Sequence, residues 1–151
     1  MPQNNQGCGN HPILGALGKV WTSPNTALGL AAAGASYLAG KVAGTNPSFQ
    51  IGNNSIQLLN SPLNVNNRAY TLGNVQVYGV GDGPSRGQTS YTGAFVNTGL
   101  HEEGHTVQAQ ILGPLYPPAW GLGRLFGGDS AGNPMESGAD KYALGQSCSG
   151  F

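Results

Sequence analysis

The first long run of apolar positions, residues 26–42, predicts a helix. Large apolar side chains such as Leu28, Leu38 and Val42 recur there, and the positions between them are mostly Ala and Gly. So many small residues favour a helix that packs closely against another element, and a membrane-active segment is the alternative. A membrane crossing is not expected, because the run contains Lys41 and lacks the Leu, Ile and Phe density of a span.

Between residues 48 and 80 the pattern changes and predicts short strands. Runs of β-forming residues are separated by turn-prone groups of Gly and Asn. This arrangement is typical of a small antiparallel sheet or a pair of hairpins, followed by a long loop rich in Gly, Ser and Thr. The strands are expected at residues 49–51, 55–59, 69–72 and 75–78, the turns at 52–54 and 73–74, and the loop at 79–93.

Two later helices have clear start and stop signals. Asn97 or Thr98 can cap a helix that ends at Leu112, before a Gly-Pro pair. Asn133 precedes a proline, which suits the first position of a helix, and predicts a helix over residues 134–144. A glycine follows that helix and stops it.

These elements predict one α+β domain of 151 residues. Residues 1–12 are expected to be a flexible leader rich in Asn, Gln and Gly, and residues 114–132 an irregular aromatic segment. The polar start lacks the charged and apolar segments of a cleavable signal peptide. Whether Met1 is the natural start or the edge of a fragment stays open.

Charge is scarce in this chain and therefore informative. Charged residues make up 8%, against roughly 25% in ordinary soluble domains, and the net charge is zero. Nucleic acid is not an expected partner, because no basic stripe exists to hold it. Four of the six acids are concentrated in two places, within residues 101–105 and at Glu136 and Asp140. The two cysteines, Cys8 and Cys148, are compatible with one disulfide or with two free thiols.

The run His-Glu-Glu-Gly-His over residues 101–105 carries the strongest chemical signal. Residues four apart share one face of a helix, so His101 and His105 can offer two imidazole nitrogens to one metal ion. Glu102 then lies beside the ion, where its carboxylate can take a proton from bound water. Glu103 points off that face and is expected to be a solvent-side residue.

A catalytic zinc ion commonly takes three protein ligands, so a third must come from outside this run. The metzincin class is excluded, because Gln108 and Ile111 stand where it needs Gly and His. His11 lies in the polar leader and is expected to be solvated. Glu136 is the better candidate, because packed helices would bring it to the metal and bring Asp140 to an imidazole N–H. The alternative for Glu136 is a capping box at the third position of its helix.

The two segments are similar to the gluzincin metallopeptidases, the thermolysin-like group. In that group a Glu on a later helix is the third zinc ligand, and an Asp four residues further on supports the first His. The resemblance implies a zincin-like fold in which His101, His105 and Glu136 hold zinc. It also implies that Glu102 is the general base and that Asp140 orients His101. The chain departs from the well-known gluzincins in being very short, without room for a large second lobe.

A longer stretch, residues 101–117, resembles the core of small metallopeptidase domains at the C-terminal ends of bacterial polymorphic toxins and secretion-system effectors. Domains attached to Rhs-type repeat proteins are among them. Residues 71–78 and 133–136 fit the same pattern, so the resemblance extends over residues 45–145. It implies a domain that is secreted or delivered into a competitor or host cell and hydrolyses peptide bonds with zinc. The expected partners are a protein or peptide substrate, a delivery protein and a cognate immunity protein.

The oxyanion donor and the substrate class stay open. Tyr116 and Tyr142 are the candidates for stabilising the oxyanion, with structural packing as the alternative for each. A zinc-bearing binding module without turnover is the alternative to a peptidase. A cell-wall peptidase or amidase acting on peptidoglycan peptides is a further alternative, because substrate choice would lie in residues 79–96 and 114–132.

Overall fold

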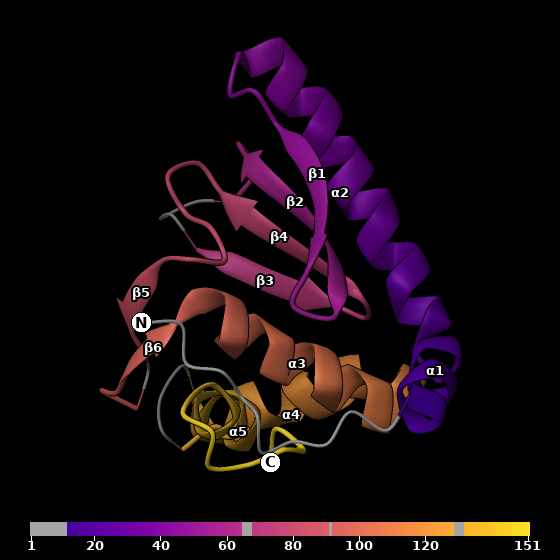
Figure 1. Cartoon of the computed structure of the whole chain (residues 1–151), viewed down its shortest axis with the longest axis vertical. Helices are drawn as coiled ribbons and strands as arrows, with labels where there is room; N and C mark the ends of the chain where they lie inside the picture. The colour runs from indigo at the N-terminus through magenta and orange to yellow at the C-terminus, as the bar shows by residue number, and fades with distance from the viewer. Residues whose placement is uncertain (1–11, 65–67, 91, 129–131) are drawn as a thin grey trace.

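A four-stranded sheet with helices on both faces forms the centre of the structure (Figure 1). The α+β class expected from the sequence is confirmed. The expectations about His11 and about the pairing of Cys8 fall on residues that the structure does not describe. The structure, a computed structural model, describes residues 12–64, 68–90, 92–128 and 132–151.

The helices and strands alternate along the chain in blocks. The helices are α1 (Pro12–Trp21), α2 (Ser23–Ala43), α3 (Thr98–Leu112), α4 (Tyr116–Gly127) and α5 (Pro134–Ala143), with a 3₁₀ turn, η2 (Gly113–Leu115), before α4. The strands are β1 (Ser48–Gly52), β2 (Ser55–Ser61), β3 (Ala69–Leu72), β4 (Val75–Gly79), β5 (Gly87–Thr89) and β6 (Phe95–Asn97). Within the described ranges, no helix combines the length and the hydropathy that a membrane crossing needs.

The main sheet consists of two hairpins side by side, in the order β1-β2-β4-β3. Both predicted hairpins are present, with Gly52 opposite Ser55 and Leu72 opposite Val75 at their turns. The prediction of an antiparallel sheet is wrong where the hairpins meet, because β2 pairs with β4 in parallel. After β2 the chain forms β3 at the outer edge of the sheet, and β4 then lies between β3 and β2. β3 is therefore an edge strand, as β1 is on the other side of the sheet.

Helix α2 covers one face of the sheet through small residues. Its buried side carries Gly29, Ala33 and Gly40. A Cβ at Gly29 would lie 2.5 Å from the carbonyl oxygen of Leu72, so only glycine allows this approach. The predicted close packing of this helix is confirmed. The larger apolar residues of the helix, such as Val42, face solvent instead.

The opposite face of the sheet is polar and receives helix α3. Side chains alternate along a strand, so Val77 joins the core beneath α2 while Gln76 and Tyr78 point to the other side. Gln76 Nε2 donates to Thr106 Oγ1 of α3 at 3.0 Å. Gln57 Nε2 donates to Gln76 Oε1 at 2.8 Å. These side chains are fully buried, so their hydrogen bonds fix the position of α3 on the sheet.

Regular structure extends further than the sequence predicted. Helix α1 begins at Pro12, the last residue of the expected leader, whose other residues lie outside the described ranges. Helix α2 begins at Ser23 rather than at residue 26. Helix α4 occupies a segment expected to be irregular. Its Pro117 and Pro118 stand in the first turn, where backbone N–H groups need no partner within the helix. The predicted loop at residues 79–93 contains β5, which pairs with β6.

Candidate metal site

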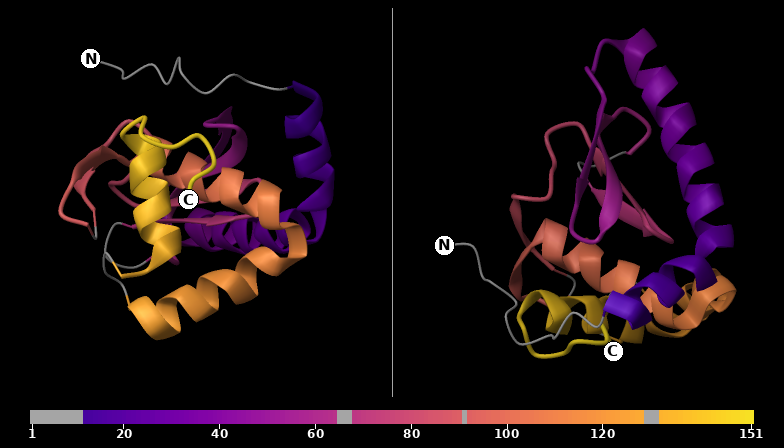
Figure 2. Two further views of the ribbon diagram at one scale, coloured as in Figure 1. Left: turned by 90° about the horizontal axis from the view of Figure 1, so that it is seen from below. Right: turned by 45° about the vertical axis from the view of Figure 1, so that its right-hand side comes forward.

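Helix α5 crosses α3 at a contact between small residues, and α4 runs back from the end of α3 towards the start of α5 (Figure 2). A Cβ at Gly104 would lie 2.8 Å from Ala139 Cα, so glycine is needed at this crossing. Asn97 and Asn133 cap the two helices as predicted, and each accepts a hydrogen bond of 3.0 Å from a backbone N–H. The crossing brings the two halves of the sequence motif together.

Three side chains from these helices converge on one point. Glu136 Oε2 lies 3.3 Å from His101 Nε2 and 3.4 Å from His105 Nε2. The three ligand atoms all lie within 4.8 Å of one another. Each of these residues is at most 6% exposed. The group can therefore hold a metal ion.

Two of the three spacings between the ligand atoms match those around a tetrahedral ion. With metal–ligand bonds of about 2.0–2.1 Å, two ligand atoms of a tetrahedron are roughly 3.3–3.4 Å apart. The Glu136 oxygen meets this spacing with both imidazoles. The rings of His101 and His105 stand almost perpendicular, at 88°, so they meet at their edges. Three protein ligands leave a fourth position for water or substrate.

The other ring nitrogens are held by acceptors, which leaves Nε2 of each ring for the ion. His101 Nδ1 lies 2.9 Å from Asp140 Oδ1, and His105 Nδ1 lies 2.8 Å from Gln108 Oε1. An ionised carboxylate and an amide oxygen can only accept, so each Nδ1 donates, and in the neutral ring that binds a metal ion each Nε2 presents a lone pair. Asp140 lies against His101, where the sequence predicted it.

Gln108 is a site residue that the sequence analysis did not assign. Its Nε2 donates to the carbonyl oxygen of Met135 at 2.8 Å and also to that of Gly150. Gln108 is fully buried and so ties His105 to the start of α5 and to the C-terminal segment. The sequence did contain one indication of this contact, because a residue three positions after His105 lies on the same side of the helix. Its two backbone partners depend on the tertiary structure.

The charges around the cluster favour a cation between its ligand atoms. Burial alone would lower the pKa of His101, but hydrogen bonds with Asp140 and Glu136 outweigh burial and raise it. Burial alone would raise the pKa of Glu136, but the two histidines lower it overall. Three of the chain's six acids, Glu102, Glu136 and Asp140, are at most 6% exposed. Burying so many carboxylates is unfavourable unless positive charge offsets them.

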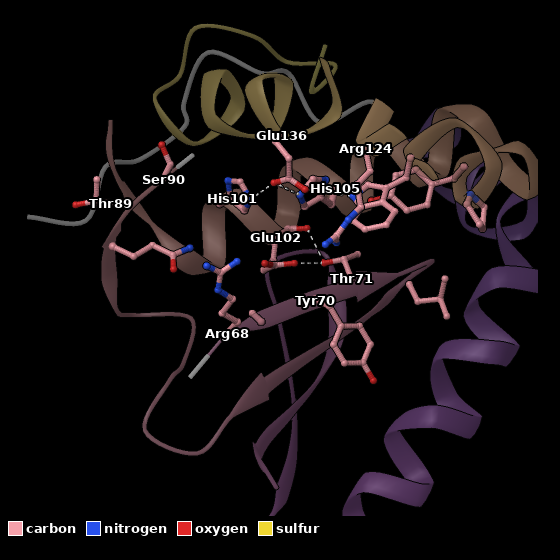
Figure 3. A pocket seen from close by; sticks show the side chains of 16 residues that line it. Arg68, Tyr70, Thr71, Thr89, Ser90, His101, Glu102, His105, Arg124 and Glu136 are labelled. Atoms are coloured by element: carbon pink, nitrogen blue, oxygen red, sulfur yellow. Dashed lines mark hydrogen bonds and ion pairs between the residues drawn. The ribbon is translucent and has the colours of Figure 1, made fainter. Parts of the chain in front are cut away.

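Glu102 lies on the strand side of the two histidines (Figure 3). Thr71 Oγ1, on the edge strand β3, donates to Glu102 Oε2 at 2.6 Å. Glu102 itself is only 4% exposed. Thr71 was not predicted, because no spacing in the sequence connects residue 71 with residue 102. The hydrogen bond fixes one carboxylate oxygen of Glu102 and leaves the other for the site.

The cluster opens into a cavity of about 550 Å³, within the usual range for ligand sites. Tyr116 lines this cavity, and its ring meets that of His105 edge-on, with the centroids 6.5 Å apart. Burial, followed by the charges of Glu102 and Glu136, raises the pKa of Tyr116. The Tyr116 hydroxyl therefore stays protonated near neutral pH and keeps its capacity to donate.

Trp120 holds the Glu136 carboxylate from the side of α4. Its Nε1 donates to Glu136 Oε1 at 3.2 Å, while Oε2 faces the two histidines. Both oxygens are engaged at the cluster, which favours the ligand interpretation over a capping box. Trp120 was not predicted as a site residue, because it lies in the segment expected to be irregular.

Tyr142 does not line the cavity. Its hydroxyl donates to Glu103 Oε1 at 3.1 Å, and burial, followed by the charge of Glu103, raises the pKa of Tyr142. Asn53 Nδ2, in the β1–β2 turn, donates to Glu103 Oε2 at 3.3 Å. The prediction that Glu103 is a solvent-side residue is therefore wrong. Glu103 is half-buried where α3 meets this turn and α5.

The side chains of the site indicate what it can bind. No protein-family model, curated protein or solved structure matches the chain. Two imidazoles and a carboxylate form a donor set that binds a divalent metal ion, and the buried cluster supplies it.

We expect Gly104→Ala to disturb the cluster without changing any of its side chains. The new Cβ would press on Ala139 and push α5 away from α3, which separates Glu136 from the histidines. The affinity for a divalent metal ion should fall at least roughly tenfold. The free energy of unfolding should fall by about 1–3 kcal/mol. Metal titration and denaturant unfolding measure the two effects.

Gly121→Ala is the matched control for this substitution. Nothing lies within 4 Å of a Cβ at Gly121, which also belongs to a helix. Alanine is the better helix former, so this variant should keep the metal affinity of the wild type and be at least as stable. Equal losses in the two variants would contradict the importance of the α3–α5 crossing.

Proposed function

We propose that this protein is a zinc-dependent peptidase with Glu102 as its general base. The observation that carries the proposal is the convergence of three buried ligand atoms beside Glu102 in one cavity. Two imidazoles and one carboxylate are ligands that suit zinc, and the carboxylate oxygen lies at tetrahedral spacing from both imidazoles.

The residues of the chain have separate parts in this chemistry. Zinc, when bound, supplies a Lewis acid that acidifies water and polarises a carbonyl group. The Glu102 carboxylate accepts the proton of the attacking water and passes it to the leaving amine. Thr71 keeps Glu102 in place through its hydrogen bond of 2.6 Å. Asp140 and Gln108 keep the two imidazoles turned with Nε2 towards the ion.

The edge strand supports an extended peptide as the substrate. β3 is one of the two outer strands of the sheet, and residues 68–72 line the cavity beside Glu102. An edge strand offers backbone N–H and C=O groups with which an extended chain can pair as an additional strand. Such pairing would hold a peptide bond next to the metal cluster.

We expect Tyr116→Phe to lower kcat by roughly 10²-fold, because loss of one oxyanion donor has about this effect. Zinc content should stay the same, since Tyr116 lines the cavity without being a ligand. Tyr142→Phe is the matched control, because that hydroxyl donates to Glu103 outside the cavity. Steady-state kinetics compares the two variants. Equal kcat losses would remove Tyr116 from the mechanism.

Metal removal tests the proposed function directly. The protein is stripped with a chelator and offered a mixed library of unfolded peptides with quenched fluorophores. We expect cleavage to stop after stripping and to return with one equivalent of zinc, whereas magnesium and calcium should not restore it. Cleavage that survives complete removal of the metal, or no cleavage at full zinc occupancy, would contradict the proposal.

Delivery of the domain into a competitor or host cell stays a prediction drawn from the resemblance of residues 101–117. The same holds for its expected partners, a delivery protein and a cognate immunity protein. Peptidoglycan peptides stay an alternative substrate. Purified peptidoglycan and unfolded protein, offered side by side to the zinc-loaded protein, separate the two classes by the new amines that each releases. Release from peptidoglycan alone would replace a protease with a cell-wall peptidase.

A further inference from the structure

Two arginines line the metal cavity. The chain has only six Lys and Arg residues, and Arg68 and Arg124 are the two that line this cavity. Figure 3 shows them reaching towards Glu102 from opposite sides, Arg68 from the side of His101 and Arg124 from that of His105. In so charge-poor a chain, this placement brings positive charge to both ends of the cavity.

The charge balance of the cavity depends on the metal. Arg68 and Arg124 balance the two carboxylates of the lining, Glu102 and Glu136, when the histidines are neutral. A divalent ion would raise the net charge of the lining to about plus two, and the Asp140 carboxylate behind His101 would reduce it to about plus one. The loaded cavity therefore attracts anions and repels cations.

Contacts within the fold hold the side chain of Arg124 and the backbone of Arg68 in place. The Arg124 guanidinium lies over the Trp120 ring, 5.4 Å from its centroid, and Trp120 donates to Glu136. Stacking on Trp120 fixes the plane of the guanidinium, and arginine binds carboxylates in that plane. The backbone carbonyl of Arg68 accepts hydrogen bonds from Gly79 N at 3.1 Å and from Asn64 Nδ2 at 3.0 Å. The backbone is thereby fixed immediately before β3.

We propose that Arg68 and Arg124 form carboxylate subsites on the two sides of the metal cluster, so that the protein selects acidic peptides. The inference rests on the proposed peptidase function for the peptide itself. The carboxylate can belong to an Asp or Glu side chain or to the C-terminus of the substrate. Lysine-rich peptides are disfavoured by the same charges.

Binding without turnover provides the test. Zinc-loaded Glu102→Gln protein is titrated with acetylated, amidated octapeptides that differ only in Glu, Gln or Lys on each side of the central bond. A fourth peptide carries Gln and a free C-terminal carboxylate. Fluorescence anisotropy gives the affinities at low and high salt. The same titrations are repeated after Arg68→Gln with Arg124→Gln, and after Arg86→Gln, whose side chain lies outside the cavity.

We expect the Glu peptide to bind roughly tenfold more tightly than the Gln peptide at low salt, and the Lys peptide to bind most weakly. High salt should reduce these differences. The double arginine variant should abolish them, and Arg86→Gln should retain them. A gain confined to the peptide with the free C-terminus would also support carboxylate recognition and would assign its source to the terminus.

Equal binding of all four peptides, including no binding, would overturn the inference. So would an advantage of the Glu peptide that survives in the double variant. Cleavage by the wild-type protein is measured in parallel. Cleavage without charge preference would overturn the carboxylate subsites and leave the peptidase intact, whereas charge-selective binding without any cleavage would overturn the peptidase alone.

Discussion

Glu102→Gln is expected to lower kcat for peptide hydrolysis by at least roughly 10³-fold while the protein keeps its zinc. A general base contributes about 10²–10⁴-fold to such reactions. Glutamine keeps an oxygen that can accept the hydrogen bond from Thr71, but its amide cannot take a proton at neutral pH. Steady-state kinetics and metal analysis of the same preparation measure the two properties together.

Glu103→Gln is the matched control for this variant. It makes the same chemical change at the neighbouring position of α3, but Glu103 accepts hydrogen bonds from Tyr142 and Asn53 and does not line the cavity. Its kcat should therefore stay close to that of the wild type. If Glu102→Gln binds zinc and keeps full biological effect, the protein is a zinc-bearing binding module and hydrolysis is not its function.

Glu136→Ala is expected to lower zinc affinity at least roughly 10²-fold, since removal even of residues that only orient a ligand typically costs about 10–100-fold. The substitution removes the one oxygen that lies within 3.4 Å of both imidazole Nε2 atoms. His101 and His105 then remain as a two-ligand site. Competition with a fluorescent zinc chelator measures the affinity.

Two further variants on α5 provide comparisons for the zinc affinity of Glu136→Ala. Asp140→Asn keeps all three ligands but weakens the hold on His101, so its affinity should lie between those of the wild type and Glu136→Ala. Ser137→Ala changes a residue whose hydroxyl donates to the backbone of Pro134, and should bind zinc as the wild type does. Full zinc occupancy in Glu136→Ala would reject Glu136 as the third ligand.

The sequence predicts best what is encoded locally. The starts of the two motif helices follow from side chains that accept hydrogen bonds within the first turn, so Asn97 and Asn133 could be identified as caps. The shared face of His101 and His105 follows from helix periodicity alone. The meeting of Glu136 with that face needed a further assumption, that α5 packs across α3. The glycine at position 104 makes this packing sterically feasible.

Features that depend on tertiary contacts could not be predicted in this way. Thr71 and Trp120 reach the site from β3 and α4, and no spacing in the sequence connects them with Glu102 or Glu136. The parallel pairing of β2 with β4 has the same origin, since local patterns predict each hairpin but not how two hairpins join. Helix α4 was not predicted, although its two prolines stand in the first turn, where they are compatible with a helix.

The anomalous scattering of crystals of the protein, measured at the zinc absorption edge, would locate the metal ion directly. We expect one strong peak about 2.0–2.2 Å from His101 Nε2, His105 Nε2 and a carboxylate oxygen of Glu136. A zinc peak at other residues, or no peak at the cluster in crystals grown with excess zinc, would contradict this expectation.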